Sequence, residues 1–152
     1  MEIRTFADLI DWTRQLHSHL AKCLAHCSSN NEEERARLLL DYLAEHENKM
    51  EKMVSAFELQ AEPKVMKTYI YDYLSHQPIQ SHRTCDAPYA QLGFDDICQE
   101  VFDYHQQIIE LYRDIEARAE IPEARTLLGS LLEMKEHEAM RLTRQTGRMS
   151  DI

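Results

Sequence analysis

Residues 95–119, DDICQEVFDYHQQIIELYRDIEARA, carry the pattern that decides the fold. Apolar side chains recur in this stretch at spacings of three and four residues, from Ile97 to Ile115, without a glycine or proline between them. This spacing places them on one face of an α-helix. Because His105 falls in the middle of that face, the stretch predicts a helix with an inward-pointing histidine.

The same spacing recurs in three other segments, at about 7–26, 32–60 and 122–145. Thr5 resembles a helix cap, and the polar cluster 28–31 predicts a short turn. Three of the four prolines and one glycine lie in 61–93, which we interpret as a long crossover with a short helix at about 64–75. We therefore predict an all-α protein, with residues 1–152 forming one up-down four-helix bundle of two antiparallel hairpins.

Charge and composition restrict the partners. The 152 residues include only 3 glycines and 4 prolines, and the formal net charge is −10, which disfavours nucleic acid and anionic membrane surfaces as partners. The sequence shows neither a signal peptide nor 18 apolar residues in a row, and its four cysteines lack metal-site spacing. We expect a cytoplasmic protein with reduced thiols and with no nucleic acid or membrane partner.

Four ionisable residues, one on each predicted helix, lie within apolar stripes: His17, Glu47, His105 and Glu138. Each has apolar neighbours three, four or seven positions away, and each lies near the middle of its helix. Antiparallel packing would therefore bring the four side chains to a similar height in the bundle. Since a buried ionised carboxylate is costly unless it is paired or binds a metal, the set requires a shared explanation.

Two explanations compete for these residues. Imidazole and carboxylate are suitable ligands for Fe, Mn or Zn, and four donors leave positions open for water or dioxygen. The alternative is a metal-free hydrogen-bonded network in which Glu47 pairs with a histidine and Glu138 pairs with Lys135, Arg141 or the other histidine. No motif for an organic cofactor is present.

A helical register shifted by one residue would give a different site. It would turn His46 and His137 inward, with Glu133 as a carboxylate four residues before His137. Their neighbours Lys49 and Arg144 favour the boundary between interior and solvent instead.

The stretch LYRDIEARAEIPEARTLLGSLLEMKEHEAMRL at 111–142 resembles the second hairpin of rubrerythrin-like proteins of the ferritin-like superfamily. The resemblance covers the four long helices. It implies a di-iron site in which two helices each give a Glu and the other two each give Glu-x-x-His. The bridging carboxylates of that pattern match Glu47 and Glu138.

The chain departs from this family at the remaining ligand positions. It has His17 and His105 where the family has Glu, and Met50 and Arg141 where the family has His. The six-ligand set is therefore absent, and the resemblance favours a mononuclear or altered metal site.

We therefore expect a metal-binding ferritin-like protein, with iron- or manganese-dependent oxidoreductase activity as a possible function and an unknown substrate. The alternative is a non-catalytic helical bundle, an interaction or structural protein that has lost its metal site. The helix predicted at 95–119 carries more apolar surface than one interior requires, because Phe102, Ile109 and Leu111 widen its stripe. This surplus predicts a homodimer through that helix.

Overall fold

Helices account for every element of the computed structural model, which describes residues 5–67 and 88–150. The elements are α1 (Phe6–Asn30), α2 (Glu34–Gln60), the single-turn α3 (Pro63–Met66), the 3₁₀ helix η2 (Pro88–Ala90), α4 (Phe94–Arg118) and α5 (Pro122–Ser150). The all-α prediction is confirmed for this part of the chain. Two helices are longer than predicted, since α1 ends at Asn30 rather than near 26 and α5 ends at Ser150 rather than near 145.

Side chains define both ends of α1. Thr5 is the predicted cap: its hydroxyl accepts a hydrogen bond from the Asp8 N–H, and the Asp8 carboxylate accepts one from the Thr5 N–H. At the other end the helix continues through most of the predicted turn to Asn30, and Asn31 is the C-cap. The Asn31 amide donates to the carbonyls of Tyr89 and Leu92, at 3.0 and 3.1 Å. This buried asparagine therefore ties the end of α1 to the segment that leads into α4.

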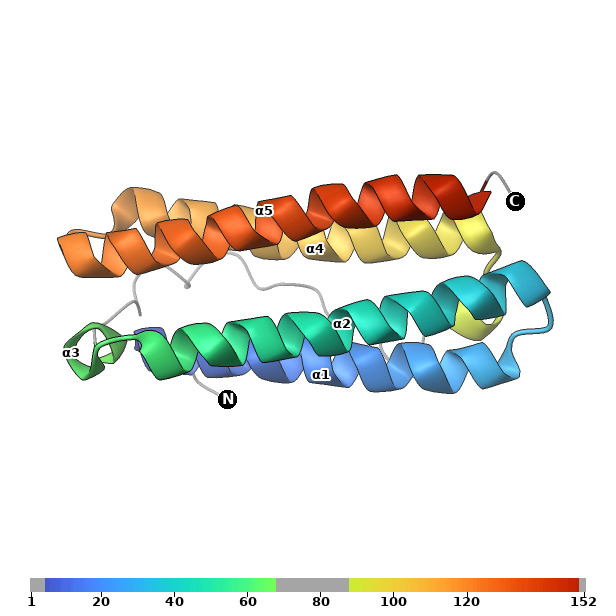
Figure 1. Ribbon diagram of the computed structural model, residues 1–152, viewed down its shortest axis with the longest axis horizontal. Helices are drawn as coiled ribbons and strands as arrows, with labels where there is room; N and C mark the ends of the chain where they lie inside the picture. Colours follow the sequence, from blue (N-terminus) through green and yellow to red (C-terminus); the bar gives the residue numbers. More distant parts are fainter. Residues whose placement is uncertain (1–4, 68–87, 151–152) are drawn as a thin grey trace.

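The four long helices lie side by side as two hairpins, α1 with α2 and α4 with α5 (Figure 1). In the same view α2 and α4 run in the same direction, away from the end where α1 turns into α2. Buried apolar side chains from all four helices form one core. Of the short helix predicted at 64–75, the structure describes only α3, and residues 68–75 lie outside the described part.

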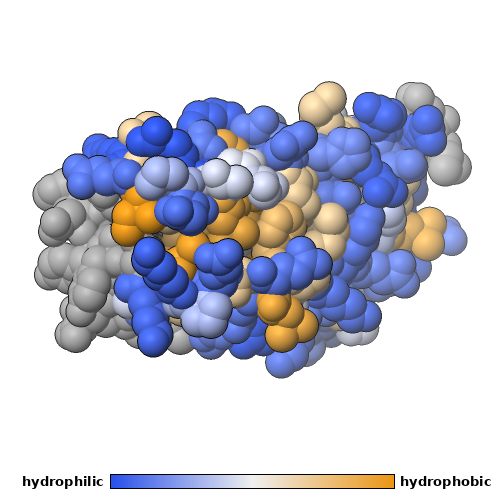
Figure 2. Space-filling model, turned by 60° about the vertical axis from the view of Figure 1, so that its left-hand side comes forward, coloured by the Kyte–Doolittle hydropathy of each residue, from blue (hydrophilic) through white to orange (hydrophobic). Residues whose placement is uncertain are grey.

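The surplus apolar surface predicted for α4 is covered within the chain. Ile109 and Leu111 are buried, and Phe102 is half-buried. The large exposed hydrophobic side chains among the described residues are Leu38, Leu59, Ile121 and Met140. None of them belongs to α4, so the described residues do not show the exposed apolar surface on which the homodimer prediction was based. The homodimer itself stays a prediction. On the face drawn in Figure 2, apolar side chains form a band between hydrophilic ones.

The cysteines differ from the prediction of reduced thiols. Cys27 and Cys98 are free and buried, as expected. Cys23 is disulfide-bonded, so the prediction is wrong for this residue. Across residues 5–67 and 88–150, none of the helices combines the length and the apolar character needed to cross a membrane.

Candidate metal centre

Glu47 of α2 lies at the centre of the candidate site, fully buried, with a histidine against each carboxylate oxygen. His17 of α1 brings Nδ1 to 2.5 Å from Glu47 Oε2, and His105 of α4 contacts Oε1 through Nε2. Both rings are buried as well. One ligand atom from each of the three residues lies within 4.8 Å of the others. The structure thus brings together three of the four residues predicted as metal ligands.

Lys135 of α5 occupies the interior on the far side of His17. Its Nζ lies 3.0 Å from His17 Nε2 and 5.4 Å from the centre of the Tyr112 ring, and the side chain is buried. Lys135 was one of the pairing partners predicted for Glu138, and it contacts His17 instead. Leu128 and Leu142, one heptad before and after Lys135, are both fully buried. That spacing is the sequence signal that Lys135 points inward.

The protonation states follow from burial and from the neighbouring charges. Burial, together with the charge of Lys135, lowers the pKa of His17 to about 4, so its ring is neutral at pH 7. Burial alone would raise the pKa of Glu47, but attraction to His105 and His17 and their hydrogen bonds lower it well below its usual value. Burial also lowers the pKa of Lys135, to about 8, which leaves the amine charged at pH 7.

These states give the hydrogen bonds a direction. A charged Lys135 can only donate, so His17 Nε2 accepts and His17 Nδ1 carries the proton that is donated to Glu47 Oε2. His105 donates its Nε2 proton to Glu47 Oε1. A neutral imidazole therefore bridges a buried ammonium and a buried carboxylate.

Acid should destabilise the protein through His17. The pKa of this ring is about 4 in the folded protein, against an ordinary value of 6.5 for a solvated histidine of the unfolded chain. Between these values the unfolded state binds the extra proton, so stability is lost as the pH falls from about 6.5 toward 4. We expect a loss on the order of 3 kcal/mol in urea denaturation between pH 7.5 and pH 4. His137→Gln, which changes an exposed histidine, should keep the pH dependence, and an equally steep curve in His17→Gln would contradict this assignment.

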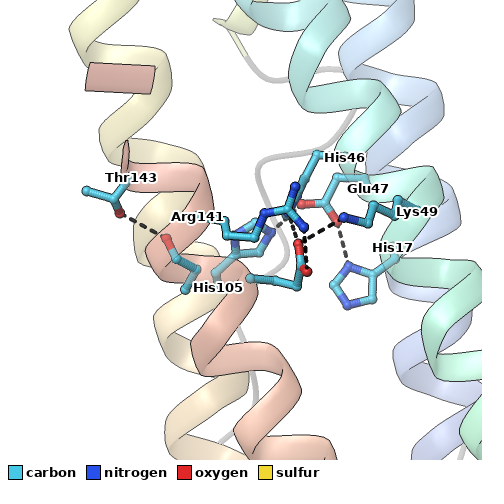
Figure 3. A network of polar contacts seen from close by, with 9 residues as sticks. His17, His46, Glu47, Lys49, His105, Arg141 and Thr143 are labelled. Atoms are coloured by element: carbon cyan, nitrogen blue, oxygen red, sulfur yellow. Dashed lines mark hydrogen bonds and ion pairs between the residues drawn. The ribbon is translucent and has the colours of Figure 1, made fainter. Parts of the chain in front are cut away.

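Glu138 of α5 is buried but belongs to a separate group of contacts, with His46, Lys49 and Arg141, three residues that Figure 3 draws close together. Its carboxylate lies 3.5 Å from Lys49 Nζ, 3.5 Å from Arg141 and 3.4 Å from His46 Nε2. The predicted pairing with Arg141 is present, whereas the contact with Lys49 was missed. Glu138 is not among the residues whose ligand atoms meet at Glu47, so its role as a metal ligand stays a prediction. Two cations hold it at the edge of the interior.

His46 is buried, although its charged helix neighbour predicts a position at the boundary. Only 8 % of its surface is exposed, and its ring centre lies 5.9 Å from that of His105. Leu39, Leu43 and Met50 flank it on the helix and are all buried, so the inward face of α2 is wide enough to hold two adjacent residues. His137, the other histidine of the shifted register, is exposed. The inward orientation that the shifted register predicts is thus confirmed for His46 and wrong for His137.

A small cavity and a larger pocket lie on either side of His46 and Glu138. A small inner cavity of about 10 Å³ is lined by His17, His46, His105, Lys135 and Glu138, among others. This is about the space that one water molecule needs. A larger outer pocket of about 260 Å³ is lined by Tyr42, Glu45, His46, Lys49, Glu138 and Arg141. His46 and Glu138 line both the inner cavity and the outer pocket and therefore separate them.

No known family model, curated protein or solved structure matches this chain.

Proposed function

We propose that the protein binds one iron, manganese or zinc ion through His17, Glu47 and His105. The observation that carries this proposal is the meeting of two imidazoles and one carboxylate, all buried, with ligand atoms within 4.8 Å of one another. Two histidines and one carboxylate with open positions are typical of non-haem iron(II) sites, and manganese and zinc accept the same donors.

The three side chains fit a metal ion after a small adjustment. His17 Nδ1 lies 2.5 Å from Glu47 Oε2, whereas two ligands of one ion with bonds of about 2.0–2.1 Å are separated by roughly 3 Å. The His17 ring and the Glu47 carboxylate therefore have to move apart by about half an ångström. Both imidazole nitrogens that face Glu47 would exchange their protons for the ion, as metal ligation requires. The inner cavity beside the two rings leaves space for this rearrangement.

A ferritin-like architecture is part of the proposal. The two hairpins side by side, with α2 and α4 running in the same direction, support it (Figure 1). The ligands of the di-iron pattern are missing, since Met50 is buried beside the cavity and Arg141 holds Glu138 at the edge. We therefore propose a mononuclear site in a modified ferritin-like bundle.

Iron or manganese at this position would supply one-electron or dioxygen chemistry, which makes an oxidoreductase the enzyme class that we propose. The residues around the site restrict what can react there. Glu47 balances positive charge in an interior closed by apolar side chains, and the inner cavity of about 10 Å³ has no room for an organic substrate. The reacting partner would be a molecule close to the size of water.

Metal addition should raise the melting temperature of metal-depleted protein. We expect one equivalent of Fe²⁺ (without oxygen), Mn²⁺ or Zn²⁺ to bind, and about 2.7 kcal/mol of added stability when the free ion is at 100 times its Kd. Thermal denaturation and elemental analysis after dialysis measure the two effects. Mg²⁺, which prefers oxygen ligands, is the matched control ion and should have little effect. If none of the three ions binds, the proposal is wrong.

A second candidate function has its own supporting observation. Both oxygens of Glu47 and both ring nitrogens of His17 have hydrogen-bond partners in the absence of an ion. The network could thus serve only to fix how the helices pack, in a non-catalytic interaction or structural protein. For such a protein, the same three ions would leave the melting temperature unchanged.

A further inference from the structure

Among residues 5–67 and 88–150, neither ring nitrogen of His46 has a hydrogen-bond partner, although more than nine-tenths of its surface is buried. Its Nε2 lies 3.4 Å from Glu138 Oε2 but not in a direction that makes a hydrogen bond. Leaving a buried polar group unsatisfied costs about 1–3 kcal/mol, so such groups call for an explanation, often an ion or a water. His46 therefore points to a ligand that occupies the space beside it.

The position of His46 indicates what this ligand does. Together with Glu138, it forms the wall between the outer pocket and the inner cavity that contains His17 and His105. An imidazole and a carboxylate are suitable ligands for a divalent cation. Both face the outer pocket, which opens between α2 and α5 on the way to the inner site.

Two positively charged side chains lie between the outer pocket and Glu138. Lys49 and Arg141 each lie 3.5 Å from the Glu138 carboxylate, and their side chains are 45 % and 51 % exposed. They neutralise Glu138 and repel an approaching cation. Their exposure lets them swing into solvent when a divalent ion takes their place.

We propose that His46 and Glu138 form an entry position, where a divalent cation from the outer pocket binds before it passes to His17, Glu47 and His105. Lys49 and Arg141 slow this step. The inference rests on the proposed function, because it concerns how the same ion reaches its site. It assigns to His46 a transient contact rather than a place in the final ligand set.

The test is the rate of Co²⁺ uptake by the metal-free full chain, followed in a stopped-flow spectrometer by visible absorption. His46→Gln should lower the rate about tenfold and still bind one equivalent of Co²⁺. The Lys49→Gln/Arg141→Gln double variant should raise the rate about tenfold, because charges at the mouth of a cleft change association rates by factors of about 10–10³.

The chain offers matched controls three residues further along α2 and α5. Lys52 and Arg144 are exposed, so Lys52→Gln/Arg144→Gln makes the same change of charge away from the pocket and should leave the rate unchanged. His137→Gln, at an exposed histidine, is the control for His46→Gln.

The outcomes separate the two proposals. Uptake at the wild-type rate in both test variants, with one equivalent bound, would overturn the entry position and leave the proposed function intact. Loss of the bound equivalent in His46→Gln would place His46 in the final ligand set and would also overturn the entry role. If wild-type protein binds no Co²⁺ after prolonged incubation, the proposed function fails, and the entry position fails with it.

Discussion

The Glu47→Gln variant is expected to be about 3 kcal/mol less stable than wild type and to bind metal at least a hundredfold more weakly. In wild type, each oxygen of the Glu47 carboxylate accepts a hydrogen bond from an imidazole N–H group. The glutamine amide has one oxygen that accepts and one NH₂ group that donates, so one of these two hydrogen bonds is lost. The charge of Lys135 also loses its buried counter-charge. Urea denaturation of metal-free protein and a Mn²⁺ titration measure the two effects separately.

Glu133→Gln is the matched control for this variant, because Glu133 is exposed on α5 and the substitution removes the same charge. Its stability should stay within about 0.5 kcal/mol of wild type. If Glu47→Gln is as stable as this control, the hydrogen bonds at Glu47 do not hold the helices together. If it keeps wild-type affinity for Mn²⁺, the metal is bound elsewhere.

Helical periodicity was sufficient to find the centre of the site. His17, Glu47 and His105 each lie in a strongly apolar stripe. A residue in the middle of such a stripe points inward even when its own side chain is polar. Because the three lie near the middle of helices in adjacent hairpins, inward orientation was enough to make them meet. The same reasoning gave the all-α class and the approximate helix positions.

The rest of the site depends on which helices approach one another and how closely. Glu138 is also buried, but Lys49 of α2 reaches it from across the interface with α5, a contact that no single-helix pattern reveals. Lys135 is long enough to reach His17 on α1, and only the three-dimensional packing shows that it does. The boundary position predicted for His46 is wrong because its apolar neighbours on the helix, Leu39, Leu43 and Met50, are all buried, while the Lys49 side chain reaches solvent without turning His46 outward.

The end of α1 was missed for a similar reason. A cluster of serine and asparagine is typical of turns, but here the helix continues to Asn30. The side-chain amide of Asn31 accepts from the Glu33 N–H and donates to the carbonyls of Tyr89 and Leu92, which lie 58 and 61 residues further along the chain. A local pattern contains no information about contacts at that separation.

The Lys135→Met variant should bind Mn²⁺ or Zn²⁺ about ten- to a hundredfold more tightly than wild type. A buried ammonium beside His17 repels a divalent ion, and at a separation of roughly 5 Å and an effective dielectric constant of about 20 this repulsion amounts to several kcal/mol. The ammonium also keeps the His17 proton on Nδ1, the nitrogen that faces Glu47, and so opposes the tautomer that a metal needs. Methionine removes both effects and fills a similar volume.

Isothermal titration calorimetry at pH 7 compares this variant with wild type and with Lys52→Met, which removes one exposed positive charge from α2. Lys52→Met should bind like wild type, because an exposed charge is screened by solvent and salt. Raising the pH from 7 to 9 should narrow the difference between wild type and Lys135→Met, because wild-type Lys135 loses its charge near its pKa of about 8. Weaker binding in Lys135→Met would contradict this account, since it would mean that the amine supports the ion instead of opposing it.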